Sequence, residues 1–150
     1  MVDIICYCLN PNHYHLLVLQ KTEGGIPKFM HKLGLGYTCY FNEKYKHSGS
    51  LFQGKYKFKP ISSTIDLLKV SVYINCNAKI HGIAKAENWS WSSHLDYIGN
   101  RKGTLCNKED IYEEFRNIKE IEKPKEYKEF CKEWIMDIKK IKYLKKFDIE

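Results

Sequence analysis

The feature that most constrains the fold is a pair of short apolar segments separated by a tight turn. Residues 3–9 are mostly apolar, as in a buried strand, and Asn10-Pro11-Asn12 follows, a combination that favours a turn. Residues 13–19 then form a second apolar segment of strand length. Two strands joined by so short a connection can pair only in antiparallel fashion. The sequence therefore predicts a β-hairpin at the N-terminus.

The rest of the chain predicts four helices and one further strand. Lysines alternate with aromatic residues from Lys55 to Lys59, which is the pattern of a strand with two unlike faces. Ser62 or Ser63 is expected to cap the helix that follows. The order β-β-α-β-α fits an α+β, ferredoxin-like domain without its opening strand and helix, with helices on one face of an antiparallel sheet. The predicted helices span residues 26–46, 63–77, 108–117 and 125–146.

Length and charge restrict the class of protein. A chain of 150 residues suits one modest domain, and it has no apolar run of the roughly 20 residues that a membrane-spanning helix needs. The N-terminus does not have the pattern of a signal peptide, so six free cysteines in a reducing cytoplasm are expected. The net charge of +7 lies entirely within residues 1–107. This distribution suits a polyanionic partner such as nucleic acid. The alternative is an excess of positive charge that serves solubility alone and has no partner.

A metal site is suggested by His13 and His15. Residues two apart on a strand point to the same side, and two neutral imidazoles there can hold a divalent ion while leaving other coordination positions open. The alternative is two unrelated polar residues on an exposed face. Cys6 and Cys8 share the same spacing, but no second Cys/His pair completes a zinc set of the usual kind.

A polar stripe runs along the helix predicted for residues 63–77. Asp66, Lys69, Tyr73 and Asn77 fall on one side of this otherwise apolar helix. If the helix covers the face that displays the histidines, Tyr73 reaches the metal region and Asn77 can offer its amide oxygen. The alternative is a tyrosine whose hydroxyl bonds to the backbone.

A band of basic and aromatic residues runs from Tyr37 to Lys59, and its lysines could follow a phosphate backbone while aromatic rings stack on bases. The alternative is that the aromatic residues belong to the core and that only the lysines indicate DNA binding. The candidate DNA-binding lysines are Lys46, Lys55, Lys57, Lys59 and Lys69.

Several segments, in this order, resemble one family. The segment 7–18, with His13-Tyr14-His15, resembles the histidine–hydrophobic–histidine (HUH) strand of single-tyrosine HUH transposases of the REP-associated type. The segment 49–56 resembles the family's glycine-bounded basic strand, and Tyr73-Ile74-Asn75-Cys76-Asn77 resembles its catalytic-helix motif. Trp91-Ser92-Ser93-His94 with Tyr97 resembles the element that follows. The resemblance covers about residues 5–99.

The resemblance implies a metal-dependent enzyme that cuts and rejoins single-stranded DNA. Tyr73 would be the nucleophile, forming a 5′-phosphotyrosine intermediate, and His13, His15 and Asn77 would hold Mg²⁺ or Mn²⁺. Two residues depart from the family pattern: Ala78 stands where proline is usual, and Asn10 where methionine is usual. The family's first strand and helix are also expected to be missing here, which leaves a catalytically inactive, DNA-binding remnant as the alternative.

These expectations extend to organisation and partners. Residues 1–99 are predicted to form a partial HUH domain and residues 100–150 a helical extension. The expected partner is single-stranded DNA with hairpin ends, with a possible homodimer and no membrane, in the cytoplasm at the nucleoid. A third reading is an α+β domain that binds no nucleic acid at all.

Overall fold

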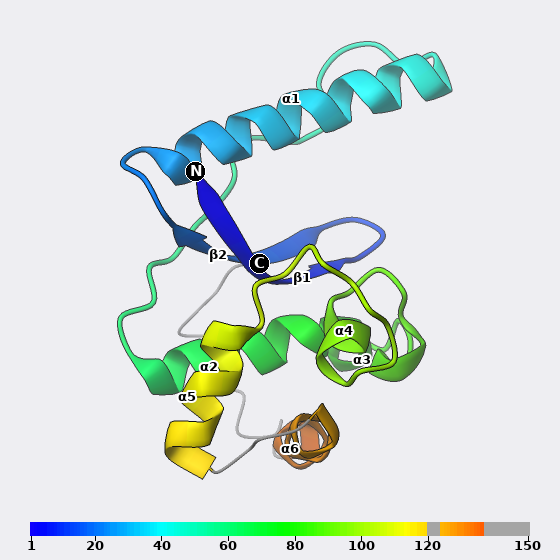
Figure 1. Ribbon diagram of the computed structural model, residues 1–150. Helices are drawn as coiled ribbons and strands as arrows, with labels where there is room; N and C mark the ends of the chain where they lie inside the picture. Colours follow the sequence, from blue (N-terminus) through cyan, green and yellow to red (C-terminus); the bar gives the residue numbers. More distant parts are fainter. Residues whose placement is uncertain (120–123, 137–150) are drawn as a thin grey trace.

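The computed structural model describes residues 1–119 and 124–136 and has an α+β fold, as expected. Figure 1 shows a β-hairpin near the middle of the molecule, with helix α1 above it and the other helices below. Residues 137–146 of the last predicted helix lie outside the described residues. In chain order the elements are β1 (Val2–Leu9), β2 (Tyr14–Gln20), α1 (Gly25–Tyr45), α2 (Thr64–Asn75), α3 (Asn77–Ile80), a 3-10 turn η1 (Ala86–Asn88), α4 (His94–Tyr97), α5 (Glu109–Lys119) and α6 (Pro124–Met136).

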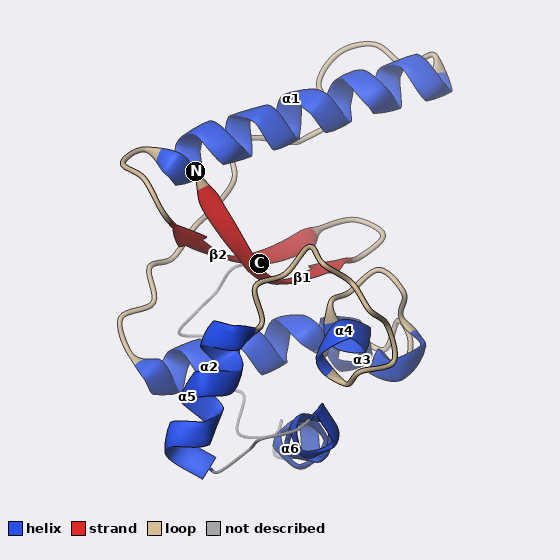
Figure 2. Ribbon diagram, viewed as in Figure 1, coloured by secondary structure: helices blue, strands red, loops and turns tan. Residues whose placement is uncertain are grey.

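The predicted hairpin is confirmed. Strands β1 and β2 pair antiparallel, with Cys8 opposite His15 and Leu9 opposite Tyr14. The turn between them closes through the Asn10 N–H, which donates to the His13 carbonyl at 2.8 Å. Figure 2 shows this hairpin as the whole sheet of the described residues.

The edge of β1 that faces away from β2 is covered by two later segments. The Ser93 N–H donates to the Tyr7 carbonyl at 3.0 Å, and the Asn107 N–H donates to the Ile4 carbonyl at 2.8 Å. Single bridge pairings, Cys8 with Ser92 and Ile4 with Cys106, lie at the same two places. These contacts bring the segments on either side of α4 back to the hairpin and pair backbone groups of β1 that β2 leaves free.

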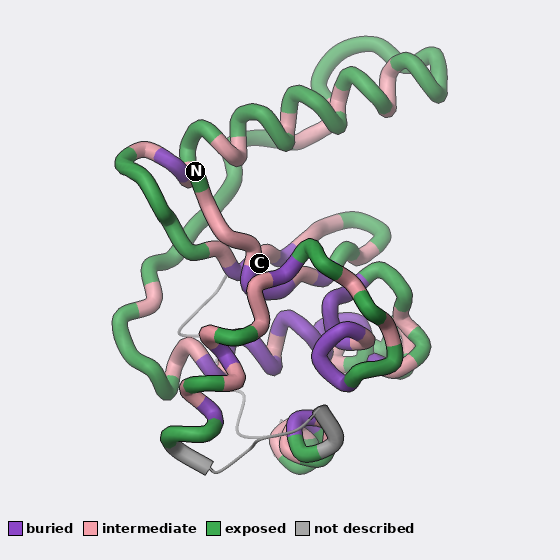
Figure 3. Tube along the Cα trace, in the orientation of Figure 1, coloured by how far each residue is buried: buried purple, intermediate pink, exposed green. Residues whose placement is uncertain are grey.

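Helix α2 packs beneath the hairpin and carries the main core. Its start is fixed by Ser63, whose hydroxyl accepts a hydrogen bond from the Asp66 N–H at 3.1 Å, so the predicted serine cap is confirmed. Figure 3 shows buried residues concentrated along α2 and the adjacent short helices. The fully buried side chains beneath the hairpin include Val72, Ile74, Tyr97, Ile111, Phe115 and Tyr127.

Helix α1 lies on the other side of the hairpin from α2 and is largely exposed (Figures 1 and 3). The helices therefore do not all cover one face of the sheet. At the start of α1, Gly25 lies so close to the Met1 carbonyl oxygen that a side chain would collide with it. A glycine is needed there for the helix to begin beside β1.

The predicted strand at residues 55–59 is wrong. The segment 55–63 has no regular secondary structure, and Tyr56 and Phe58 are exposed. Alternation gives two unlike faces, but a strand also needs a backbone partner and a surface to bury its apolar side. Neither is supplied to this segment, since its aromatic face stays in solvent.

The second predicted helix is divided in two. Helix α2 ends at Asn75, Cys76 separates the two parts, and the short helix α3 begins at Asn77. None of the described helices combines the length and apolar character that crossing a membrane requires.

Candidate active site

The start of strand β2, with His13 just before it, and helix α2 bring two imidazoles and a phenol together. The rings of His13 and His15 lie 5.0 Å apart between centroids, at an interplanar angle of 80°. The Tyr73 ring lies 5.7 Å from the His15 ring, also edge to face. The structure thus brings Tyr73 to the two histidines, as the sequence predicts if the helix covers their face.

His15 is buried, with 3% of its surface exposed. Burial, and then the positive charges of His13 and His81, lower the pKa of His15 from 6.5 to about 4. Neither of its ring nitrogens has a hydrogen-bond partner among the described residues. At neutral pH His15 is thus an uncharged imidazole with a free lone pair.

Asn77 is fully buried at the start of α3 and faces the same region. Its side-chain oxygen accepts a hydrogen bond from the Asn10 amide, and the same Asn10 nitrogen lies 2.9 Å from His13 Nε2. The Asn77 amide nitrogen has no partner among the described residues. Asn10 therefore places one donor between the two acceptors, His13 Nε2 and Asn77 Oδ1.

Asn12 sets the tautomer of His13. Its side-chain oxygen lies 2.7 Å from His13 Nδ1 and accepts a hydrogen bond from the N–H at that position. His13 Nε2 is then the acceptor that faces Asn10 and Asn77. This is how a neighbouring polar group commonly orients a histidine that binds metal through its other nitrogen.

His81 is a third imidazole at this place. Its ring lies 5.8 Å from the His13 ring, just after helix α3. Sequence reasoning gave it no role. The available signal was its position four residues after Asn77, which puts both on the same side of a helical turn.

The residues present fit a divalent cation. Two acceptors from different elements, His13 Nε2 and Asn77 Oδ1, converge on one point that a donor now fills. A buried, neutral His15 with no hydrogen-bond partner stands beside them. A buried imidazole without a partner is costly, and a cation bound by nitrogen and oxygen would satisfy His15 while taking the place of the Asn10 donor at His13 Nε2 and Asn77 Oδ1.

The candidate DNA-binding lysines lie in three places. Lys69 is half-buried on α2, one turn before Tyr73, and Lys46 ends α1 with a left-handed backbone. Lys55, Lys57 and Lys59 are exposed in the segment that joins α1 to α2. Their role in binding DNA stays a prediction.

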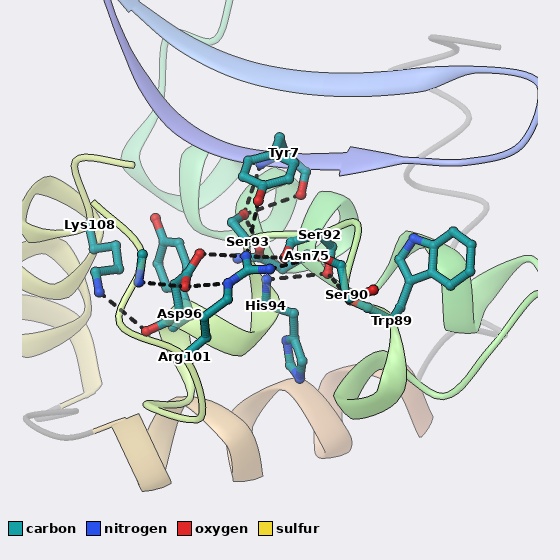
Figure 4. Close-up of polar contacts among 12 residues, drawn as sticks. Tyr7, Asn75, Trp89, Ser90, Ser92, Ser93, His94, Asp96, Arg101 and Lys108 are labelled. Atoms are coloured by element: carbon teal, nitrogen blue, oxygen red, sulfur yellow. Dashed lines mark hydrogen bonds and ion pairs between the residues drawn. The ribbon is translucent and has the colours of Figure 1, made fainter. Parts of the chain in front are cut away.

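A buried hydrogen-bond chain holds helix α2 against the hairpin (Figure 4). The Ser93 hydroxyl donates to the Asn75 side-chain oxygen at 2.6 Å, and the Tyr7 N–H donates to the Ser93 hydroxyl at 2.9 Å. Asn75 in turn donates to the Tyr127 hydroxyl of α6 at 2.8 Å. The helix that carries Tyr73 is thereby fixed to β1 and to α6.

An ion pair supports the same region. Arg101 contacts Asp96 through two nitrogens at 2.7 Å each, and donates to the Tyr7 hydroxyl at 3.0 Å (Figure 4). Burial alone would raise the pKa of Asp96, but the hydrogen bonds and charge of Arg101 lower it below its usual value. Sequence reasoning missed this pair, because nothing in the spacing of Asp96 and Arg101 distinguishes it from a surface contact.

Comparison with known proteins defines the family. Residues 1–77 match the family model described as "Transposase IS200 like". The matched segment contains His13, His15, Tyr73 and Asn77. No curated protein and no solved structure matches the chain. Since the family match covers more than half of the 150 residues, the chain belongs to the family of IS200-like transposases.

Proposed function

We propose that this transposase cuts and rejoins single-stranded DNA, with Tyr73 as the nucleophile. The observation that carries the proposal is the position of the Tyr73 ring. It lies edge to face with the His15 ring, with 5.7 Å between the ring centroids. Tyrosine is one of the side chains that form covalent intermediates, and a neighbouring metal ion can activate such a nucleophile.

In the proposed reaction the Tyr73 oxygen attacks a phosphorus atom of the DNA backbone. A new bond forms between that oxygen and phosphorus, and the bond from phosphorus to the 3′ oxygen breaks. The phenol loses its proton and the released 3′ oxygen gains one. The product is a 5′-phosphotyrosine and a free 3′ hydroxyl, and because the ester is conserved, the reverse attack can rejoin strands without a nucleotide energy source.

His13, His15 and Asn77 would hold the divalent ion, Mg²⁺ or Mn²⁺. Such an ion would supply Lewis-acid polarisation of the scissile phosphate. His15 suits this role because burial keeps it unprotonated, and His13 because Asn12 holds its Nε2 as an acceptor. Lys69, on the same helix as Tyr73, would contact phosphate or favour the tyrosinate.

The proposed substrate is single-stranded DNA with hairpin ends. Membership of the transposase family implies action on DNA, and the positive charge within residues 1–107 supports a polyanionic partner. Residues 1–99 would form the HUH domain and residues 100–150 its helical extension, acting in the cytoplasm at the nucleoid, with a homodimer as the proposed assembly.

The test uses the full chain with Mn²⁺ and labelled single strands taken from the DNA that flanks its gene. A covalent protein–DNA adduct that resists denaturation is expected, and Tyr73→Phe should abolish it. Tyr45→Phe, which changes an exposed tyrosine at the end of α1, is the matched control and should form the adduct normally. An adduct that survives in Tyr73→Phe would reject Tyr73 as the nucleophile.

A second candidate function is DNA binding without cleavage. It is favoured by Asn10, whose amide already satisfies His13 Nε2 and Asn77 Oδ1. It predicts salt-sensitive binding to single strands with no adduct at any Mn²⁺ concentration. Adduct formation by the purified protein, lost in Tyr73→Phe, would exclude it.

A further inference from the structure

A second cluster of metal-binding side chains lies apart from the histidines of β2. Cys76, His94 and Cys131 are all buried, and their ligand atoms lie within 4.8 Å of one another. In Figure 4 the His94 ring points away from the polar network around Arg101 and toward helix α6. The cluster therefore lies between α6 and the short helices that follow α2.

The three residues come from separate parts of the chain. Cys76 stands at the junction of α2 and α3, His94 begins α4, and Cys131 lies within α6. The three donors stand on three separate elements, so no short sequence motif brings them together. None of the cysteine spacings in the sequence has the form of a zinc motif. Their convergence is a property of the fold.

The distances suit a tetrahedral metal ion. Cys76 Sγ and His94 Nδ1 lie 3.8 Å apart. Bond lengths of about 2.3 Å to sulfur and 2.1 Å to nitrogen put two tetrahedral ligands about 3.6 Å apart. Two thiolates and an imidazole are a donor set that selects zinc over magnesium or manganese.

Glu87 lines the space beside the cluster, and a side-chain rotation would bring its carboxylate to the fourth position, among lysines that balance the charge. A cavity of about 10 Å³ beside the cluster is lined by Glu87 together with Lys79, Lys128 and Lys132. Zinc with two thiolates is neutral, and a carboxylate from Glu87 would make the centre negative. The three lysines would then stabilise that centre, because they surround it with the opposite charge.

We propose that Cys76, His94 and Cys131 bind one zinc ion, with Glu87 at the fourth position. With all its positions filled, such a site is structural rather than catalytic. It would tie α6 to the end of the helix that carries Tyr73, since Cys76 directly follows Asn75, the last residue of α2. Helix α6 would thus hold the candidate active site in place through its bond to the metal.

Metal content and spectroscopy of the full chain test the proposal. Protein purified under reducing conditions should contain one tightly held equivalent of zinc. Replacement by Co²⁺ should give the sulfur-to-cobalt charge-transfer band and the intense visible bands of a tetrahedral site. Both signals should persist in a His13→Ala/His15→Ala variant, which removes the imidazoles of β2 and so separates the two sites.

Variants identify the ligands. Cys131→Ser and His94→Ala should each lose the zinc equivalent, whereas Cys39→Ser, at an exposed thiol on α1, should keep it. His94→Cys should retain zinc and strengthen the sulfur-to-cobalt band, which distinguishes lost ligation from failure to fold. Absence of that band in the unaltered protein, or retention of the zinc equivalent by both Cys131→Ser and His94→Ala, would overturn the proposal.

Discussion

The Tyr73 phenol and the His15 imidazole lie edge to face, 5.7 Å between ring centroids, although one stands on helix α2 and the other on strand β2. This relationship depends on α2 covering the inner face of the hairpin. It also depends on Asn75, which faces away from the histidines and bonds to Ser93. The position of Tyr73 is thus set by contacts on the opposite side of its own helix.

Acid is expected to destabilise the fold through His15. Its pKa is about 4 in the folded protein and 6.5 in the unfolded chain, so between these values only the unfolded chain binds the proton. The free energy of unfolding should therefore fall as pH is lowered from 6.5 to 4, by up to about 3 kcal/mol. Urea unfolding followed by circular dichroism across this range measures the effect.

The control compares how the free energy of unfolding depends on pH in two variants, His15→Phe and His31→Gln. The first variant should lose most of the dependence on pH between 4 and 6.5, since the buried group that titrates is gone. The second changes an exposed histidine of α1 and should keep the slope of the unaltered protein. Equal slopes in all three proteins would show that His15 titrates normally.

Asn10 and Asn12 should affect Mn²⁺ binding in opposite directions. Asn10→Ala removes the donor that competes for His13 Nε2 and Asn77 Oδ1, and should strengthen binding by about 10-fold. Asn12→Ala releases His13 Nδ1 and should weaken binding by about 10-fold or more. Electron paramagnetic resonance of free Mn²⁺ measures both. Weaker binding in Asn10→Ala would mean that Asn10 itself is a ligand.

Removal of Arg101 should destabilise the protein strongly. Asp96 has only 4% of its side chain exposed, so Arg101→Ala would leave a buried carboxylate without its main partner. A loss of about 3 kcal/mol is expected in urea unfolding at pH 7. Lys21→Ala breaks an ion pair with Asp3 that is far more exposed, and should cost less than about 1 kcal/mol. Equal losses in the two variants would contradict this account.

The exposed lysines between α1 and α2 should contribute to DNA binding through charge. Changing Lys55, Lys57 and Lys59 together to alanine should weaken binding to single strands and reduce the slope of log K against log salt by about 2. Lys102→Ala, elsewhere on the surface, should leave the slope nearly unchanged. Fluorescence anisotropy at several salt concentrations measures both. An unaltered slope in the triple variant would remove these lysines from the DNA-binding surface.

The hairpin and the helix of Tyr73 were predictable because local chemistry determines them. The Asn10-Pro11-Asn12 turn allows only a close return of the chain, and Ser63 caps the helix that its apolar pattern indicates. The turn and the cap each depend on residues that are neighbours in sequence. The polar stripe on that helix predicted that Tyr73 would reach the histidines only if the helix covered their face, which is a matter of tertiary packing.

The remaining features depend on contacts between distant segments. The alternation at residues 55–59 indicated a strand, but no strand edge within the described part of the chain pairs with it and its aromatic residues stay exposed. The donor that Asn10 places between His13 and Asn77 follows from tertiary packing. No spacing rule reveals a contact of that kind, because its partners lie on separate elements.

The covering of β1 by the segments around Ser92 and Cys106 has a consequence for self-association. A strand edge with free N–H and carbonyl groups can recruit a strand of another molecule and so start aggregation. Here that edge is occupied by the chain's own backbone, so recruitment at β1 would first require both segments to detach. Their detachment would also break the Tyr7–Ser93 bonds, which links resistance to aggregation with the integrity of the helix that carries Tyr73.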